Sequence, residues 1–454
     1  MNIDSINIKA IKATNLRVDA SYHLSEGQEV KRIINSCPYE KLTIKDVSSD
    51  IFIGGRAKRV YVTKKEHGIP FLSSSDILQA DLENVKLASK KYTPNLEQMK
   101  LKKGWTLISR SGTIGNCAFA NAKHAQKLAS EDVIRVYPNN ILRQGLIYAY
   151  LASKYGHSLL TQGIFGAVIQ HIEPAFVASL PIPDFPESFQ KEVDDLIQKS
   201  AKLREGATDA LEEAHIILCD SLKLDKLNCV EKNRVTIKNI LSSHNTRFEG
   251  SYYTSRNRNI YDYITTHFEY DTLGCLSERI FRPGIFKREY VKKGVTFLGG
   301  ADILMAIPNS EKQLSFKQVK KMPELLTKKG WILVTCGGTI GNTVYIDNQL
   351  EKCTISQHVM RIVPKSDTIQ GYLFAVLSSD IGKELITLYS TGSVIPQIES
   401  HHLERIPIPR LDYEEMKYID SLVLKYVASN ERSKQLELEA ISMVEAEIEK
   451  WNKH

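Results

Sequence analysis

The chain has 454 residues, which is too long for one compact domain and fits two or three domains that each bury a core of their own. Hydrophobic residues make up 42% of it and charged residues 25%, as in an ordinary globular protein, so a disordered or fibrous chain is excluded. The 60 Lys and Arg exceed the 53 Asp and Glu, and the formal net charge of +7 is compatible with phosphate binding but does not establish it.

The cysteines and the N-terminus indicate a compartment. The seven cysteines are an odd number without a C-x-x-C pair, which argues against a disulfide framework and a structural zinc site and favours a reducing cytoplasm. The first residues lack the apolar core of a signal peptide, and no apolar run is long enough to span a bilayer. We therefore expect a cytoplasmic protein without a metal site and without a membrane partner.

The second half of the chain repeats the first. With Gly68 set on Gly294, the two halves match over a long stretch without a gap. The sharpest match is an identical Gly-Thr-Ile-Gly-Asn at residues 112–116 and 338–342. Further upstream, small insertions separate the matching blocks. One unit of about half the chain length is therefore used twice.

Each repeat has the pattern of a mixed α/β domain. Segments rich in β-branched and aromatic residues and bounded by Gly, Pro and Asn predict strands at 59–63, 105–110 and 132–138. Residues 112–116 are then a turn between two strands. A helix is expected around residues 146–155 and, in the second copy, around 372–381.

A long helix follows each repeat. After Pro186, apolar and small residues recur at alternating steps of three and four, namely at Val193, Leu196, Ser200, Leu203, Ala207, Ala210, Ala214 and Ile217. The second copy has the same seam at Ile419, Leu422, Tyr426, Ser429, Ser433, Leu436, Ala440 and Met443. Matching seams favour a mutual coiled-coil pair; the alternative is that each helix packs only on its own domain.

The predicted fold is thus an α/β (α+β) chain with a pseudo-twofold internal repeat. It divides into a first domain at 1–185, a central long helix at 186–228, a second domain at 229–411 and a C-terminal long helix at 412–454.

Several segments of the two copies carry a family resemblance. These are GIPFLSSSDIL and GVTFLGGADIL, the Gly-Trp before SGTIGN or GGTIGN, TGSVIPQI, and the LPIPDFP and IPIPRLD that lead into the long helices. With these segments in register over nearly the whole chain, it resembles the specificity subunit of a type I restriction-modification system.

The resemblance implies two target-recognition domains, each reading one half of a split asymmetric site in double-stranded DNA. It implies that the helices form an antiparallel coiled coil that sets the spacer. It also implies two methyltransferase subunits as partners and, in some assemblies, a restriction translocase subunit. The methyltransferase would bind S-adenosylmethionine and methylate adenine, so we expect no cofactor in this chain.

The two copies differ from each other in two loops. Ala167 to Gln170 of the first copy face Ser393 to Pro396 of the second, and Arg110-Ser111 face Cys336-Gly337. If these loops contact bases, the two domains read different sequences.

Two other classes of function remain as alternatives. One is a DNA-modifying or DNA-cutting enzyme with its own site, but the chain has no NPPY-type motif, no G-x-G-x-x-G and no phosphate loop. A nuclease set could be drawn from Asp19, Glu29 and Lys31, which chance supplies often. The other is a protein-interaction scaffold, which leaves the two α/β domains unexplained. We expect no catalytic residues in this chain.

Candidate DNA contacts are Arg, Lys, Gln, Ser and Thr residues on the predicted loops. In the first copy they are Arg56, Lys58, Arg59, Lys64, Lys65, Ser73, Ser74, Arg110, Thr113 and Gln170. In the second copy they are Arg282, Lys287, Arg288, Lys292, Lys293, Thr339, Ser393 and Gln397. The glycines of the Gly-Thr-Ile-Gly-Asn segments are expected to serve the backbone of the turn, and Trp105 and Trp331 to anchor the cores.

Overall fold

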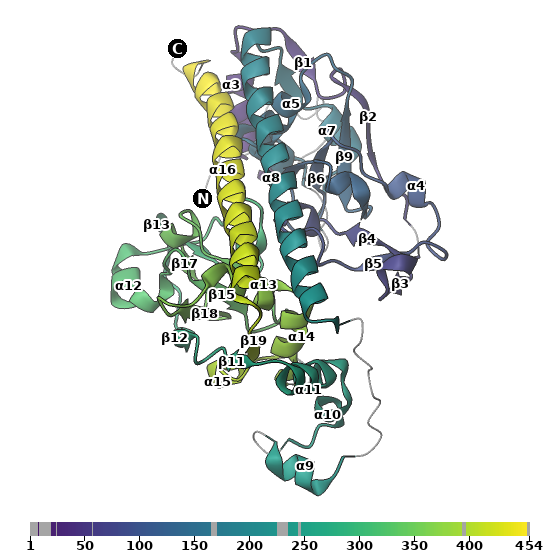
Figure 1. Cartoon of the computed structure of the whole chain (residues 1–454). Helices are drawn as coiled ribbons and strands as arrows, with labels where there is room; N and C mark the ends of the chain where they lie inside the picture. Colours follow the sequence, from purple (N-terminus) through teal and green to yellow (C-terminus); the bar gives the residue numbers. More distant parts are fainter. Residues whose placement is uncertain are drawn as a thin grey trace. The chain divides into compact units, whose positions relative to one another are not determined.

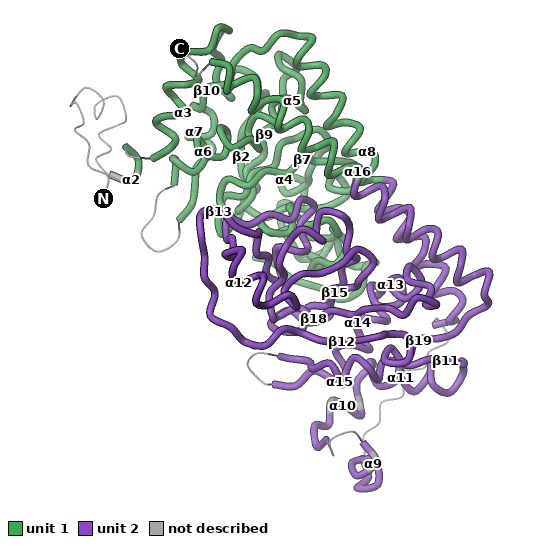
Figure 2. Tube along the Cα trace, turned by 90° about the vertical axis from the view of Figure 1, so that its left-hand side faces the viewer, with its two compact units in different colours: residues 1–205, 432–454 green, residues 206–431 purple. Residues whose placement is uncertain are grey.

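The computed structural model describes residue 8 and residues 20–23, 25–56, 58–164, 170–224, 235–243, 247–392 and 396–451. The chain forms two compact units (Figure 1, Figure 2). Unit 1 comprises Met1–Glu205 and Arg432–His454, and unit 2 comprises Gly206–Glu431. Each unit thus contains one sequence repeat and half of each long helix. This division differs from the four segments drawn from the sequence because each half helix packs on the repeat beside it.

Unit 1 is built on three small sheets. The first is fully antiparallel, with the order β2 (Ser48–Ile53), β9 (Val133–Pro138), β6 (Thr106–Ser109) and β7 (Cys117–Phe119). The second has the order β3 (Tyr61–Val62), β5 (Leu87–Ser89), β4 (Gly68–Leu72) and β8 (Leu128–Ala129), with β4 and β8 parallel. The third pairs β1 (Lys41–Thr43) with β10 (Pro181–Pro183). The strands predicted at 105–110 and 132–138 are present, whereas the one predicted at 59–63 is reduced to β3.

Unit 2 repeats this plan with one difference. Its first sheet has the order β12 (Ser277–Phe281), β18 (Val359–Pro364), β15 (Ile332–Thr335) and β16 (Thr343–Tyr345). The second has the order β14 (Gln313–Leu314), β13 (Tyr290–Leu298) and β17 (Thr354–Ile355). The third pairs β11 (Tyr270–Thr272) with β19 (Pro407–Pro409). The single strand β13 takes the place of β3 and β4. It pairs with β14 at Tyr290 and again from Val295, and the residues between them form a bulge.

Most of the helices also correspond between the units. Those of unit 1 are α2 (Ala20–His23), α3 (Glu26–Asn35), α4 (Leu96–Met99), α5 (Gln144–Ala152), α6 (Lys154–Gln162) and α7 (Pro174–Ala178). Those of unit 2 are α9 (Ile237–Ser242), α10 (Gly250–Thr254), α11 (Arg256–His267), α12 (Phe316–Lys321), α13 (Gln370–Ser378), α14 (Asp380–Leu388) and α15 (Ser400–Leu403). The long helices α8 (Glu187–Ser221) and α16 (Tyr413–Trp451) contribute to both units.

A sharp corner divides the helix expected at 146–155 into α5 and α6. The Ser153 hydroxyl accepts a hydrogen bond from the backbone N–H of Gly156 at 3.1 Å and so caps α6. A Cβ on Gly156 would lie 2.1 Å from the carbonyl oxygen of Tyr150, so only glycine fits. Ser379 and Gly382 build the same corner in unit 2, where the cap hydrogen bond is 3.2 Å long. The matched Ser and Gly of the two repeats are therefore required by this corner.

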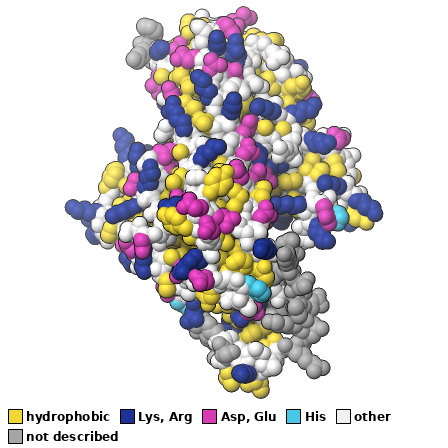
Figure 3. Space-filling model, viewed as in Figure 1, with side chains coloured by type: hydrophobic (Ala, Val, Ile, Leu, Met, Phe, Trp, Pro, Cys, Tyr) yellow, Lys and Arg dark blue, Asp and Glu magenta, His cyan; other side chains and the backbone are white. Residues whose placement is uncertain are grey.

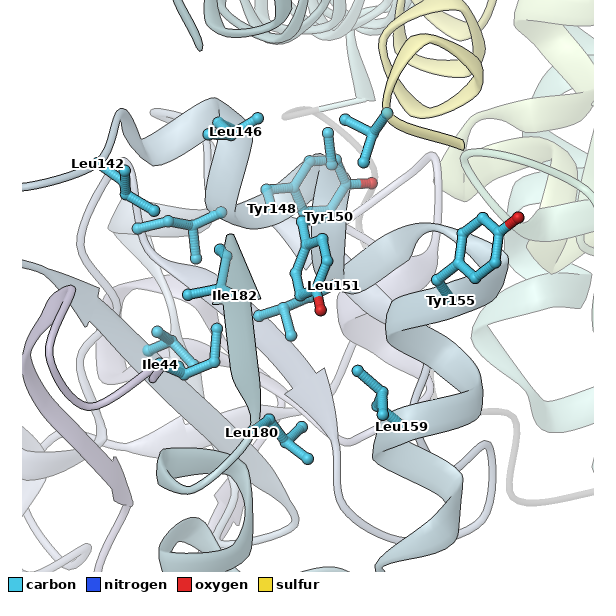
Figure 4. Packing of buried hydrophobic residues seen from close by; sticks show 14 of the residues in the cluster. Ile44, Leu142, Leu146, Tyr148, Tyr150, Leu151, Tyr155, Leu159, Leu180 and Ile182 are labelled. Carbon is cyan, nitrogen blue, oxygen red and sulfur yellow. The ribbon is translucent and has the colours of Figure 1, made fainter. Parts of the chain in front are cut away.

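The main core of unit 1 lies where α5, α6 and the short sheet β1-β10 meet the long helices. Figure 4 shows Ile44, Tyr150 and Leu180 gathered around Ile182 of β10. The Tyr150 hydroxyl donates a hydrogen bond to the carbonyl of Pro181 at 2.7 Å. Burial raises the pKa of the Tyr150 phenol, so this hydroxyl keeps its proton. Trp105 lies buried in a second cluster of this unit, as expected for a core anchor.

An arginine is fully buried in the first sheet of each unit. Among the described residues, Arg135 and Arg361 are the largest side chains that are almost completely removed from solvent. Each guanidinium donates to backbone carbonyls just before and at the start of its own strand, including Ser130 and Val133 in unit 1 and Ser356 and Val359 in unit 2. Burial lowers the pKa of both groups to about 10. The carbonyls take the place of water as hydrogen-bond partners, which makes burial of the charge tolerable.

The two long helices pair with each other and run antiparallel. In unit 1, Ser200 of α8 bonds to Ser433 of α16, and in unit 2 the Tyr418 hydroxyl of α16 donates to Glu213 of α8 at 3.0 Å. Ten of the predicted seam residues are buried, namely Val193, Ser200, Ala207, Ala210, Ala214, Ile419, Leu422, Ser433, Leu436 and Ala440. The predicted mutual pair and the predicted fold class are confirmed. The helices also pack on the repeats, since Val193 and Ala440 belong to the same core as α5.

Candidate nucleic-acid interface

The loop that leaves the first sheet carries the first group of candidates in unit 1. It joins β2 to β3, and Arg56 and Lys58 are exposed on it. Arg59 is half-buried, lies 5.0 Å over the ring of Phe71 and forms an ion pair with Glu131. Burial alone would lower the pKa of Arg59, but the hydrogen bond and the charge of Glu131 more than offset this and raise it. The positive charge of Arg59 is therefore largely neutralised.

The matching loop of unit 2 joins β12 to β13 and keeps its arginine without the acid. Arg288 lies 5.4 Å over the ring of Phe297, as Arg59 lies over Phe71. Its partner is the amide oxygen of Gln357 at 3.3 Å, and Gln357 stands where the first repeat has Glu131. A neutral amide leaves the charge of Arg288 in place. Lys287 beside it is exposed, so this loop offers two cations to a phosphate.

Two other predicted arginines are held by ion pairs with glutamates. Arg110 follows β6, donates to the carbonyl of Ile172 at 3.1 Å and forms an ion pair with Glu173, which leaves its side chain only 9% exposed. In unit 2 the matching position is Cys336, and Arg282 reaches the matching Glu399 from the other side at 2.6 Å. In each unit, one arginine therefore binds the glutamate at this position. Arg110 does so from the end of β6 in unit 1, and Arg282 does so from the end of β12 in unit 2. In this arrangement Arg110 has little surface for a base.

The Gly-Thr-Ile-Gly-Asn segments form the predicted turns between strands. Gly112 and Gly115 have φ angles of 74° and 83°, and their counterparts in unit 2 have the same left-handed conformation, so the glycines serve the backbone as expected. Thr113 is half-buried and its hydroxyl lies 3.0 Å from the hydroxyl of Ser109. Thr339 of the second turn is exposed. The two turns therefore present different surfaces although their sequences agree.

The paired lysines lie on the second sheet. Lys64 and Lys65 are exposed between β3 and β4, where Lys64 has Glu66 at 3.8 Å. Lys292 and Lys293 are exposed in the bulge of β13. Flexible lysines at these places suit contacts to phosphates, which need charge and no fixed geometry.

The remaining candidates divide between exposed and structural positions. Ser73 and Ser74 are half-buried in the turn before a short 3₁₀ helix, where the backbone N–H of Ser73 donates to Asp76 at 2.8 Å. Gln170 is exposed. Gln397 is exposed and its backbone pairs with that of Thr391. Ser393 lies outside the described residues.

In unit 2 the structure brings three of the predicted segments together. Gln397 forms a bridge with Gly337 at the start of the second turn, and Ile398 donates to the carbonyl of Cys336 at 3.2 Å. Arg282 then joins the loop before β13 to the same place through Glu399. The turn, the segment around Gln397 and the first loop residues are therefore held next to one another.

The sequence reasoning did not select the basic residues of α12. Lys317, Lys320 and Lys321 are exposed on this helix, next to β13. Figure 3 shows several Lys and Arg side chains on the side of the molecule where Figure 1 places α12 and β13, besides those on the rest of this face. The run Phe-Lys-Gln-Val-Lys-Lys was the available signal, but the first repeat has Lys-Lys-Tyr-Thr-Pro-Asn at the same register, so the match of the two copies did not single it out.

The described residues contain neither a cluster of metal-binding side chains nor a helix that could span a membrane. In this part of the chain no group of three or more His, Cys, Asp or Glu is placed to hold a metal ion. No helix of that part is both long and apolar enough to cross a membrane.

Comparisons with known proteins agree with the repeat. A family model described as type I restriction modification DNA specificity domain matches the chain twice, at residues 38–206 and 231–439. No curated protein matches the chain. A solved type I restriction-modification S subunit from M. genitalium is similar at 14% identity, covering 92% of this chain and 96% of that one, with a TM-score of 0.35. The HsdS subunit from Thermoanaerobacter tengcongensis is similar at 12% identity, covering 91% and 97%, with a TM-score of 0.28.

Proposed function

Since the chain belongs to the family of type I restriction modification DNA specificity domains and is a DNA sequence-specificity subunit with two such domains, we propose that each unit reads one half of a bipartite, asymmetric DNA site. We further propose that α8 and α16 set the length of the unspecified spacer between the two halves.

The proposal rests on the observation that the two units share one fold but have different side chains at matching positions. Both units keep an arginine over a phenylalanine at the same point of the second sheet, Arg59 in unit 1 and Arg288 in unit 2. The partner of that arginine is Glu131 in one unit and Gln357 in the other. The exposed lysines next to these arginines, Lys58 and Lys287, suit the phosphates that every sequence shares, and changed neighbours suit different bases.

The chemistry of modification is assigned to partners. We place S-adenosylmethionine and the methyl transfer to adenine on two methyltransferase subunits, with a restriction translocase as a further partner in complexes that cut DNA. The outer faces of the long helices expose apolar side chains, with Ile216 at 60%, Leu424 at 48% and Leu438 at 42% exposed. Such side chains on otherwise charged helices support docking of a protein partner there.

The test is an exchange of one repeat. Residues 14–185 are replaced by the equivalent segment of a relative, and the chain is expressed with its methyltransferase in cells whose methylated adenines are then mapped by sequencing. We expect one half of the methylated site to change and the other half to stay. A change of both halves together would contradict independent readers. Methylation by the purified chain without its partner would contradict the assignment of the chemistry to that partner.

A further inference from the structure

The loop between β12 and β13 presents an apolar side chain among cations. Ile285 is 95% exposed, more than any other large hydrophobic side chain in the described part of the chain. Arg282 precedes it, and Lys287 and Arg288 follow it. Single exposed apolar residues are common on protein surfaces, so exposure alone says little. The contacts that hold this loop in place make the exposure of Ile285 more significant.

Both flanks of Ile285 are fixed. On the N-terminal side, Arg282 is bound to Glu399 at 2.6 Å. On the C-terminal side, the ring of Phe286 packs edge-on against Phe297 with the ring centroids 6.3 Å apart.

The side chain of Gln318 on α12 then binds the loop backbone twice. Its amide N–H donates to the carbonyl of Lys287 at 2.7 Å, and its amide oxygen accepts from the N–H of Glu289 at 3.0 Å. Ile285 therefore stands out from an anchored backbone, whereas a mobile loop would be free to fold an isoleucine back onto the protein. A side chain held in this way is preorganised for something outside the chain.

The matching loop of unit 1 can be set in register with this one and has a different residue at the position of Ile285. Phe52 pairs with Arg135 in one sheet as Phe281 pairs with Arg361 in the other, which sets the two loops in register. Counting on from these pairs sets Arg56 on Ile285. Arg56 is also exposed.

The next cations in the loops agree between the units, with Lys58 on Lys287 and Arg59 on Arg288. The residues that suit phosphates are thus the same in both loops. The residue between them and the sheet differs, since it is Arg56 in unit 1 and Ile285 in unit 2. Two readers of different base pairs require that pattern.

We infer that Ile285 reads a thymine, by packing against its 5-methyl group in the major groove. Among the four ordinary bases, thymine alone offers an apolar group on that edge, so an isoleucine has one base to prefer. Lys287 and Arg288 then bind the phosphates beside it. The inference rests on the proposed function and deepens it, because it names one base contact of unit 2.

The test uses the full chain with its methyltransferase and duplexes that contain the mapped target site. Each thymine of the half-site read by unit 2 is replaced in turn by deoxyuridine, which lacks only the methyl group. At one position we expect about fourfold weaker binding to deoxyuridine, the effect of leaving one methyl group uncovered. In Ile285→Ala the preference at that position should vanish, and in Ile285→Val most of it should remain. Ile285 is too exposed for these variants to affect folding.

Lys287→Ala is the matched control and should weaken binding to thymine and deoxyuridine duplexes equally. A thymine preference that Ile285→Ala leaves unchanged at every position would overturn the inference, as would a half-site without thymine. Weaker binding of Ile285→Ala to all duplexes alike would overturn it in favour of a wedge between base pairs. A wild-type complex that does not distinguish the target from a scrambled duplex would overturn the proposed function as well.

Discussion

Ser200 and Ser433 bind each other reciprocally across the helix pair. The hydroxyl of Ser200 donates to the carbonyl of Ser433 at 3.0 Å, and the hydroxyl of Ser433 donates to the carbonyl of Ser200 at 2.9 Å. Each serine hydroxyl thus bonds to the backbone of the other helix, and this reciprocal pair fixes the register of the antiparallel helices at that point. Both side chains are buried, so a shift of the register would take these partners away from two buried hydroxyls.

A buried charge lies one turn away from the two serines and gives the first prediction. Arg204 of α8 forms an ion pair with Glu437 of α16 at 2.7 Å, with only 12% and 5% of the two side chains exposed. Arg204→Leu leaves the carboxylate of Glu437 buried without its cation, which should lower the free energy of unfolding by about 3 kcal/mol. Chemical denaturation of the purified chain measures this change.

The double variant Arg204→Leu with Glu437→Leu is the control. It removes both charges, so most of the loss should return, as is usual when an apolar pair replaces a buried ion pair. Unit 2 has Asn430 and Leu211 at the matching positions, without a charge. A double variant as unstable as Arg204→Leu would show that the packing, and not the unpaired charge, causes the loss.

His124 predicts an acid-sensitive step in the stability of unit 1. Burial lowers the pKa of its imidazole from 6.5 to about 4, with the nearby cations Arg204 and Lys127 acting in the same direction. Between these values the unfolded chain binds a proton that the folded chain does not. The contribution of the neutral His124 to the free energy of unfolding is therefore fully present above pH 6.5, and it is lost as the pH drops toward 4.

The matching residue of unit 2 is the buried Leu350, which provides the test substitution His124→Leu. From pH 6.5 to pH 5 the wild type should lose about 2 kcal/mol more stability than this variant. Unfolding midpoints measured at a series of pH values give both slopes. Parallel slopes for the two proteins would show that His124 is not the titrating group.

Arg110 of unit 1 and Arg282 of unit 2 bind matching glutamates from different strands, and this difference gives a third prediction. Arg110→Cys copies unit 2 at one position and removes the cation from Glu173, so it should destabilise unit 1 by about 2 kcal/mol, the usual value of a hydrogen bond to a charged group. Ile53 stands in β2 where the register places Arg282 in unit 2. Adding Ile53→Arg to Arg110→Cys should therefore restore part of the loss. No recovery would mean that the second route to the carboxylate needs other residues of unit 2.

The sequence predicts the large features of this fold because they depend on local patterns. The repeat, the strands at 105–110 and 132–138, the turns and the helical seam all follow from residue types at short spacings. The side-chain contacts made over long separations do not. Arg110 has the residue type of a DNA contact, but its partner Glu173 lies far along the chain and removes it from the surface. Ile285 has the residue type of a core position, and only the anchored loop shows that it is exposed.

The register of the two serines also decides how the spacer prediction is tested. The matching seams show that α8 and α16 pair, but they do not show which residue stands opposite which. Because Ser200 stands opposite Ser433 and the helices run antiparallel, an insertion three residues after Ser200 is matched by one three residues before Ser433. One heptad should therefore be inserted after Leu203 and another before Asn430. Insertions after Ala207 and after Ser433, at matching positions of the two repeats, would not face each other.

A heptad adds about 10 Å to a helix and keeps the seam nearly on its face, and about 10 Å corresponds to roughly three base pairs of duplex DNA. The matched double insertion should therefore lengthen the spacer in the methylated site by about three base pairs and leave both half-sites unchanged. If the inserted α8 heptad copies Arg204 to Ala210, an arginine stays next to Glu437. An insertion in α8 alone sets the seams out of register and should cost stability and methylation together. A stable, active double insertion that methylates sites with the original spacer would show that the helices pack the two units without measuring the distance between half-sites.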